Sequence, residues 1–149
     1  MNTVTIVRAS LEHLEALLPL VAGYRAFYEQ NNDAMRERAY LAAHLRDGSS
    51  VIFLASLAGR PAGFAQLFRV YSTVHLGRGY ILEDIFVAPG MRRHGVAAAL
   101  LDRALAHARS EGVAGMFLET ARDNQAARAL YERAGWSLEQ LFVKYNAPL

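Results

Sequence analysis

The sequence predicts a mixed α/β fold built on a single sheet. Three observations point to it: alternating β-branched segments, apolar side chains at helical spacing between them, and a strand that leads through a short loop into a strongly periodic helix. The expected order is strand, two helices, three strands, helix, strand, helix, and a final strand or strand pair. We expect antiparallel pairing in the middle of the sheet and a parallel, right-handed strand–helix–strand unit over residues 79–120.

The first part of the chain supplies one strand and two helices. Residues 3–8 alternate and are rich in β-branched side chains, which predicts a strand. Leucine, valine and tyrosine then recur in one helical stripe that closes with Tyr24 and Tyr28. A second helix is predicted over residues 33–46, with Asp33 as its N-cap.

The middle of the chain reads as three strands followed by a helix. Residues 51–57 and 61–71 flank a glycine-containing turn, which predicts a hairpin. Residues 79–88 form a further predicted strand, and the periodic helix covers residues 95–110. The remaining predicted elements are a short buried strand at 115–120, a helix at 124–134, and two short strands or one bent strand within 136–146.

Composition favours one globular domain over residues 1–149 and excludes several classes of site. Hydrophobic residues make up 53% and charged residues 20%, the balance of an ordinary soluble domain. The absence of cysteine excludes disulfides, thiolate metal sites and cysteine nucleophiles, and the five histidines lack metal spacing. A dispersed net charge of +2 predicts no nucleic-acid partner, and without a long apolar run or a signal peptide we expect no membrane partner and a cytoplasmic location.

The most informative feature is the loop from Pro89 to Ala97, which joins the strand 79–88 to the following helix. A strand that turns into a helix leaves the first helical amides unpaired, and together with the helix dipole they form an anion site. Gly95 and Ala97 keep side-chain bulk low, and two arginines add charged groups. The loop lacks both the Gly-Lys-Ser/Thr of nucleotide-hydrolysing loops and the glycine triplet of dinucleotide folds. A surface loop with two solvated arginines is the alternative.

Two segments within residues 81–136 resemble the central motifs of the GNAT superfamily of acetyl-CoA-dependent N-acetyltransferases. They read LEDIFVAPGMRRHGVAAALL and FLETARDNQAARALYERAGW. Arg92, Gly95 and Ala97 match the family's Arg/Gln-x-x-Gly-x-Gly/Ala loop, whereas Arg93 stands where the family often has glycine. The resemblance implies a single mixed sheet in which a bulged strand splays from the next parallel strand and opens a slot for the cofactor.

The resemblance also implies acetyl-CoA as co-substrate and a set of residues to hold it. The pantetheine arm would pair with the main chain at about Phe86 and Val87, and Asn124 would contact the cofactor. The pyrophosphate would bind beside Arg92, on the backbone amides of Arg93, His94, Gly95, Val96 and Ala97.

Candidate acid and base groups follow from the chemistry of acetyl transfer to an amine, which needs a proton donor for the thiolate and a neutral amine. Tyr131 is the candidate donor: it shares a helix face with Asn124, roughly 10 Å away along the axis, and the family's tyrosine has this role. The alternative is a tyrosine packed under the sheet. Glu83 and Asp84 are the candidate bases, and alternation places them on opposite faces. Similarity to polyamine-type members, which share Leu-Glu-Asp, favours Glu83; pairing with an arginine is the alternative.

The acceptor is expected to be a primary amine. Tyr24 and Tyr28 either pack in the core or line the acceptor pocket, and Glu29 and Glu119 would add negative charge that favours a cation. We expect direct attack in a ternary complex on a small amine or polyamine. The alternatives are a protein lysine or N-terminal acetyltransferase and a non-catalytic acyl-CoA-binding module. The apolar stretch 138–145 could supply exposed edge strands, which predicts a homodimer.

Overall fold

The computed structural model describes residues 3–149 and contains one five-stranded sheet with the strands in chain order. The first three neighbouring pairs are antiparallel and β4 pairs with β5 in parallel. This confirms the mixed sheet and both predicted kinds of pairing. The strands are β1 Val4–Arg8, β2 Ser50–Leu57, β3 Arg60–Ser72, β4 Gly77–Val87 and β5 Met116–Phe117.

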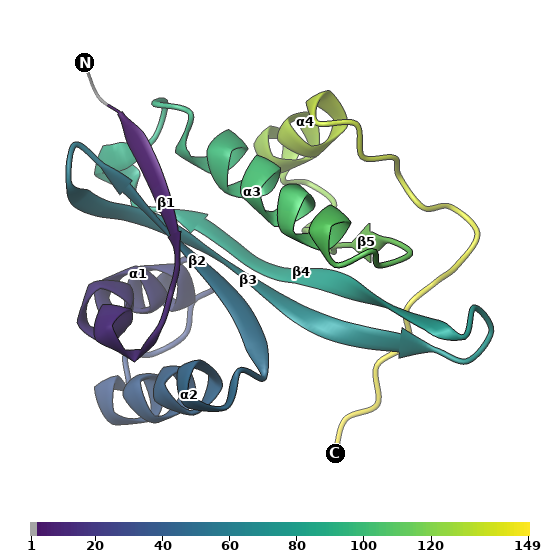
Figure 1. The fold of residues 1–149 in the computed structure, drawn as a ribbon, viewed down its shortest axis with the longest axis horizontal. Coiled ribbons are helices and arrows are strands. Elements are labelled where there is room, and N and C mark those ends of the chain that lie inside the picture. Colours follow the sequence, from purple (N-terminus) through teal and green to yellow (C-terminus); the bar gives the residue numbers. More distant parts are fainter. Residues whose placement is uncertain (1–2) are drawn as a thin grey trace. The chain divides into compact units, whose positions relative to one another are not determined.

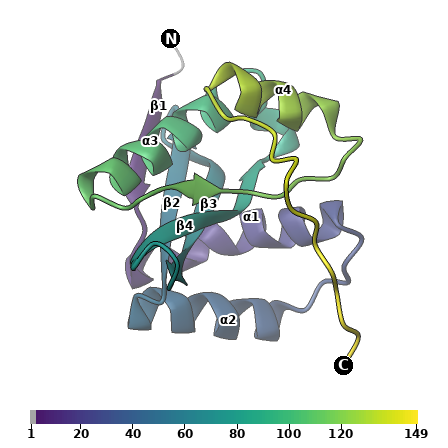
Figure 2. The same cartoon turned by 90° about the vertical axis from the view of Figure 1, so that its right-hand side faces the viewer.

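The helices form two groups. In the part of the chain that ends at Glu119, α1 and α2 lie against one face of the sheet and α3 against the other (Figures 1 and 2). Residues Thr120–Leu149 form a second compact unit, to which α4 belongs. The helices are α1 Leu14–Phe27, α2 Ala34–Asp47, α3 Val96–Ser110 and α4 Gln125–Arg133, with 3₁₀ turns η1 Leu11–His13 and η2 Pro89–Met91. No helix among residues 3–149 is both long and apolar enough to cross a bilayer.

Local signals set several element boundaries. The Asp33 side chain accepts a hydrogen bond from the Arg36 amide at 3.1 Å, which confirms it as the N-cap of α2. Gly48 ends that helix with φ +64°, a left-handed conformation that glycine adopts without steric cost. Between β2 and β3, Ala58 and Gly59 both have positive φ, as the two-residue turns of tight hairpins require.

Apolar side chains cover both faces of the sheet. On the α3 face, Phe53 of β2 contacts His107 with ring centres 5.6 Å apart, and the Arg103 guanidinium lies 4.8 Å from its ring. Burial on both faces makes the central strands a firm platform for the residues at their ends. The core on the α1 and α2 face consists of Leu17, Leu20, Val21, Leu41, Ile52, Leu54, Phe64 and Phe86.

The sheet is shorter at its far edge than the sequence predicts. Of the strand expected at 115–120, only Met116 and Phe117 pair with β4. The strands expected within 136–146 are absent, so that prediction is wrong: residues 136–149 contain no helix or strand. The apolar alternation is present in the sequence, but a strand needs a hydrogen-bonding partner, and the unit 120–149 contains no strand that could supply one.

Candidate active site

β4 contains a bulge where it pairs with β3. Gln66 of β3 pairs with Asp84, but the next residue, Leu67, pairs with Leu82. Glu83 therefore has no residue opposite it, which is the pattern of a β-bulge. The strict alternation expected for Glu83 and Asp84 is interrupted at this point.

β4 and β5 separate just before the bulge. Tyr80 pairs with Met116 and Ile81 pairs with Phe117, and the pairing between the two strands ends there. β4 continues to Val87 in register with β3. The backbone edge of β4 that faced β5 is therefore released from that strand beyond the bulge, as expected for a splayed pair of parallel strands.

The N-terminus of α3 is open to an anion. Its N-cap is Gly95, with φ +77° and no side-chain cap, and its first turn contains no acidic residue. The first helical bond runs from the Ala99 amide to the Gly95 carbonyl, so the amides of Val96, Ala97 and Ala98 precede it. A Cβ built on Gly95 would meet nothing within 4 Å. Free amides, a helix dipole and open space suit a pyrophosphate.

The arginines of the loop differ in their surroundings. The Arg92 Nε donates to the Val87 carbonyl at 3.0 Å, and its guanidinium lies 5.8 Å from the Phe86 ring centre. Arg92 therefore joins the loop to the end of β4. Arg93 is exposed with φ +67°, which costs a non-glycine residue about 1 kcal/mol. Glycine would adopt that conformation without this cost. His94 is exposed.

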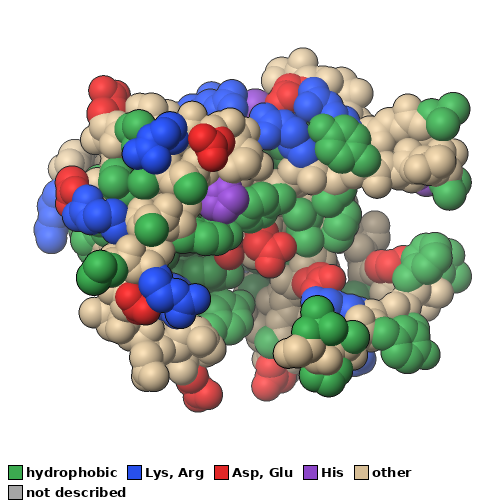
Figure 3. All heavy atoms as spheres, turned by 90° about the horizontal axis from the view of Figure 1, so that it is seen from below, with side chains coloured by type: hydrophobic (Ala, Val, Ile, Leu, Met, Phe, Trp, Pro, Cys, Tyr) green, Lys and Arg blue, Asp and Glu red, His purple; other side chains and the backbone are tan. Residues whose placement is uncertain are grey.

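A cavity of about 430 Å³ is lined by residues from α1, α2, β3 and β4. Around α1 and α2, arginine side chains lie next to acidic ones, with hydrophobic side chains between them (Figure 3). The lining is therefore mixed in character: two carboxylates, two arginines and one amide interrupt a wall of apolar and aromatic side chains. It consists of Val21, Tyr24, Arg25, Arg36, Glu37, Ala39, Tyr40, Leu41, Phe64, Gln66 and Asp84.

Asp84 is the candidate base that lines this cavity. Burial raises the pKa of its carboxyl group, the Gln66 hydrogen bond and the nearby Tyr24 hydroxyl act against that rise, and the charge of Glu83 adds to it. The Gln66 Nε2 donates to Asp84 Oδ2 at 2.7 Å. Glu83, which the resemblance favours, is exposed on the bulge, and the Tyr24 hydroxyl donates to its backbone carbonyl at 3.5 Å.

Tyr24 belongs to both the core and the cavity. Its ring meets Phe64 and Phe86 edge-on, with centres 5.6 and 5.8 Å apart, while burial and the Asp84 charge raise the pKa of its hydroxyl. The sequence left open whether Tyr24 packs in the core or lines a pocket. Its ring packs against core residues, and the side chain also lines the cavity. Tyr28 is 48% exposed and contacts the Tyr24 ring at 5.2 Å.

Three further cavity residues were not predicted. Glu37 is buried and paired with Arg25 at 2.6 Å. Tyr40 lines the cavity, and burial raises the pKa of its hydroxyl. Gln66 is the one polar side chain in the buried run 62–67 of β3, and that interruption was the available signal.

The remaining predicted site residues lie at or beyond the end of the first unit. Glu119 is exposed at the end of that unit. Within the second unit, the Asn124 side chain caps α4 by accepting from the Ala127 amide at 3.2 Å. Tyr131 is buried, with its ring 6.1 Å from that of Trp136. Roles of Glu119, Asn124 and Tyr131 in binding or catalysis stay predictions.

Residues 16–136 match the model of the Acetyltransferase (GNAT) family. The chain belongs to this family. It is 38% identical over 145 residues to the uncharacterized N-acetyltransferase YhfO of Bacillus subtilis (strain 168), covering 96% of this chain and 97% of the relative. A crystal structure of a "probable acetyltransferase" is 39% identical, with a TM-score of 0.92 over 97% of each chain. The thialysine N-epsilon-acetyltransferase of Caenorhabditis elegans is 25% identical over 132 residues, covering 89% of this chain and 82% of the relative.

The GNAT membership confirms the family, the fold class and the enzyme class predicted from the sequence. The protein is an acyl-CoA-dependent N-acetyltransferase, and enzymes of this family use acetyl-CoA and act on amines. The open N-terminus of α3 and the released edge of β4 fit the diphosphate and the amide-bearing arm of that co-substrate.

Proposed function

We propose that this GNAT enzyme acetylates a small cationic amine that binds in the cavity beside Asp84. The observation that carries the proposal is a half-buried carboxylate on the wall of a cavity of about 430 Å³. That volume suits a small molecule, and the carboxylate suits a group that arrives as an ammonium ion. The C. elegans relative, named for a small amino-acid substrate, is consistent with this class.

Acetyl-CoA would be held by main-chain groups. The amides of residues 93–97 would bind the pyrophosphate, with Arg92 keeping the loop against the end of β4. The edge of β4 at Phe86 and Val87 would pair with the pantetheine arm. When bound there, the co-substrate supplies an activated acetyl thioester.

The acceptor must lose a proton before its nitrogen can attack. Asp84, directly or through a water, would take that proton, because burial raises its pKa toward the range in which a carboxylate works as a base. Glu83 on the bulge is the second candidate for this role. The N–C bond forms as the C–S bond breaks, and Tyr131 would protonate the departing thiolate in one direct transfer within a ternary complex.

A substrate panel tests the proposal. Release of the CoA thiol would be followed with diamines, polyamines, basic amino acids, aminoglycosides and lysine peptides at equal concentration. We expect turnover with small cationic amines and little with peptides, and a response to peptides alone would overturn the small-amine proposal.

The affinity for CoA is measured separately by calorimetry. Arg92→Glu should weaken CoA binding at least tenfold, whereas Gln140→Met, an exposed change in the second unit, should leave it unchanged.

Two further sequence predictions need their own measurements. The homodimer would give twice the mass of the chain by light scattering, and a mass equal to one chain would overturn it. The single-domain organisation predicts one cooperative unfolding transition for the whole chain, whereas two separate transitions would contradict it.

A further inference from the structure

Three polar side chains on neighbouring strands form a buried hydrogen-bonded chain that ends at Asp84. The Ser50 hydroxyl of β2 donates to Gln66 Oε1 at 2.7 Å, and Gln66 Nε2 donates to Asp84 Oδ2 at 2.7 Å. Ser50 is 6% exposed and Gln66 is 3% exposed. Gln66 also lies directly opposite Asp84 in the strand register, beside the bulge. Such buried groups are costly if left unpaired, so their arrangement is well defined.

The direction of the chain follows from the chemistry of its members. An ionised carboxylate can only accept hydrogen bonds, whereas an amide has an acceptor end and a donor end. The Gln66 amide therefore turns its NH₂ group toward Asp84 and its oxygen toward Ser50, whose hydroxyl donates to it. The reversed amide would place an oxygen against the carboxylate. Ser50 thus stabilises the orientation that suits the ionised form of Asp84.

We propose that Gln66, held by Ser50, is a positioning residue that orients the Asp84 carboxylate in the cavity and favours its ionised form. The proposal rests on the proposed function, in which Asp84 is the base. It gives a role to Gln66, the one polar residue of the buried run 62–67, that core packing does not explain.

Other groups around Asp84 act in both directions. Burial raises its pKa most, the Gln66 hydrogen bond is the largest influence in the lowering direction, and the Tyr24 hydroxyl assists it. Removing the Gln66 donor should therefore let burial dominate further. The remaining titratable or charged groups that act on Asp84 or line its cavity are Glu83, His44, Tyr40, Arg25, Arg36 and Glu37, all of which the test leaves in place.

Gln66→Met tests the proposal, because methionine has a similar length and no donor. We expect the acidic limb of the kcat/KM profile to move to higher pH by about one unit, a loss of about tenfold near the limb that recovers at high pH. Ser50→Ala should move the limb in the same direction but less, because Gln66 keeps its donor and loses only its restraint. KM for acetyl-CoA should not change. A loss that is equal at every pH would overturn the positioning role.

A direct titration separates this proposal from the role of Asp84 as base. Carboxyl ¹³C NMR of labelled protein would follow Asp84, assigned by its disappearance in Asp84→Asn. An upward move of its titration in Gln66→Met supports the positioning role, and an unmoved titration overturns it. If the titration moves but the kinetic profile does not, Gln66 still positions Asp84, and it is the assignment of the base that fails. Gln140→Met, the exposed change, should alter neither measurement.

Discussion

Two carboxylates have different surroundings: Asp84, which belongs to β4, and Glu111, which forms hydrogen bonds with β4. Asp84 lies on the cavity wall, where the Gln66 amide donates to it at 2.7 Å and the nearby Tyr24 hydroxyl also lowers its pKa. These groups offset only part of the desolvation, so the pKa of Asp84 is raised. The group stays available to exchange a proton.

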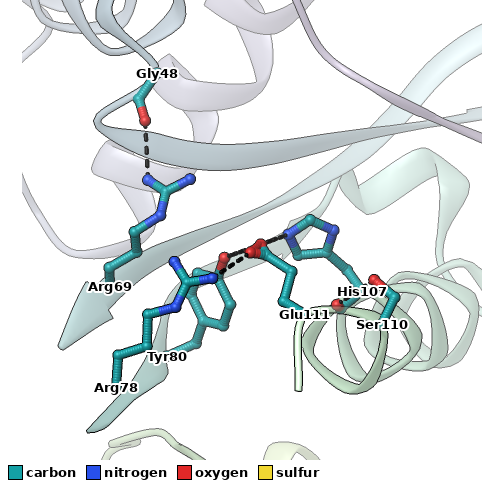
Figure 4. Close-up of polar contacts among 7 residues, drawn as sticks. All are labelled: Gly48, Arg69, Arg78, Tyr80, His107, Ser110 and Glu111. Atoms are coloured by element: carbon teal, nitrogen blue, oxygen red, sulfur yellow. Dashed lines mark hydrogen bonds and ion pairs between the residues drawn. The ribbon is translucent and has the colours of Figure 1, made fainter. Parts of the chain in front are cut away.

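Glu111 lies just beyond the end of α3 and receives hydrogen bonds from three side chains, of which Arg78 is a cation. Its Oε2 atom is 3.0 Å from the Arg78 guanidinium and its Oε1 atom is 2.8 Å from His107 Nε2 (Figure 4). The Tyr80 hydroxyl also donates to it. The Tyr80 hydrogen bond, with His107 and Arg78, lowers the pKa of Glu111. Both oxygens of this carboxylate have partners, and Glu111 joins the end of α3 to β4.

The difference teaches how to separate a structural carboxylate from a reactive one on the same sheet. Donors that outweigh desolvation keep a carboxylate ionised, as at Glu111, whereas desolvation that outweighs the donors keeps the proton affinity high, as at Asp84. Tyr80 and Asp84 are four positions apart on β4. The bulge at Glu83 lies between Tyr80, which contacts Glu111, and Asp84. The part of β4 at Tyr80 therefore makes structural contacts, whereas the part at Asp84 lines the cavity.

The largest expected effect is the loss of activity in Asp84→Asn. If Asp84 is the base, kcat/KM should fall about 100- to 1000-fold at pH 7.5, because the amide cannot take a proton. The melting temperature should stay equal or rise, since a partly buried charge is removed. Steady-state kinetics and calorimetry on the same preparation measure both.

Glu83→Gln is the matched control for that prediction, since it changes the neighbouring exposed carboxylate in the same way. A fall in rate of tenfold or less there would leave Asp84 as the base. The reverse pattern, in which Glu83→Gln is the inactive variant, would transfer the role to Glu83.

The opposite outcome is expected for Glu111→Ala. Removing this carboxylate leaves Tyr80, His107 and Arg78 without their shared acceptor, which should cost about 2 kcal/mol and lower the melting temperature by roughly 4–8 °C. Activity at 25 °C should stay within about twofold, because the variant still folds. Thermal unfolding with a rate assay tests both parts, and a tenfold loss of rate in a fully folded sample would break the distinction between the two clusters.

The pH dependence of stability should differ in sign between the two carboxylates. The lowered pKa of Glu111 stabilises the fold above the unfolded value near 4.3, and that stabilisation is lost as the pH falls through the folded value. The raised pKa of Asp84 gives a contribution that is present below the unfolded value near 3.9 and lost as the pH rises through the folded value.

Melting temperatures from pH 3.5 to 8 check this difference. Glu111→Ala should be less stable than the wild type at pH 7 and approach it in acid. Asp84→Asn should be as stable or more stable at pH 7, and its advantage should vanish near pH 3.5. Parallel curves for both variants would show that neither carboxylate is coupled to folding in the way proposed.

Local signals made much of the fold and part of the site predictable. The Asp33 cap, the turn at Ala58 and Gly59, and the loop from Arg92 to Ala97 each depend on a few neighbouring residues. The prediction of strands within 136–146 was wrong for the opposite reason. Strand formation depends on a pairing partner, which a local pattern does not reveal.

The surroundings of Asp84 and Glu111 depend on contacts between segments that are distant in the sequence. Gln66 meets Asp84 only through the register of β3 and β4, which the bulge sets, and Glu37 enters the cavity wall only through the packing of α2. Tyr80 and Glu111 are separated by 31 positions in the chain. A single sequence contains these residues but does not show which of them will meet.

The smallest expected effect concerns Tyr80→Phe, which sharpens the comparison by removing one donor without a change in shape. Glu111 keeps Arg78 and His107 as partners, so the cost should be about 1 kcal/mol, and the pKa of Glu111 should move up because the Tyr80 hydrogen bond is its largest lowering influence. Denaturant unfolding at pH 7 measures the free energy, and the same measurement at pH 4 should show a smaller difference from the wild type. A cost as large as that of Glu111→Ala would mean that the hydroxyl, and not the ion pairs, holds α3 to β4.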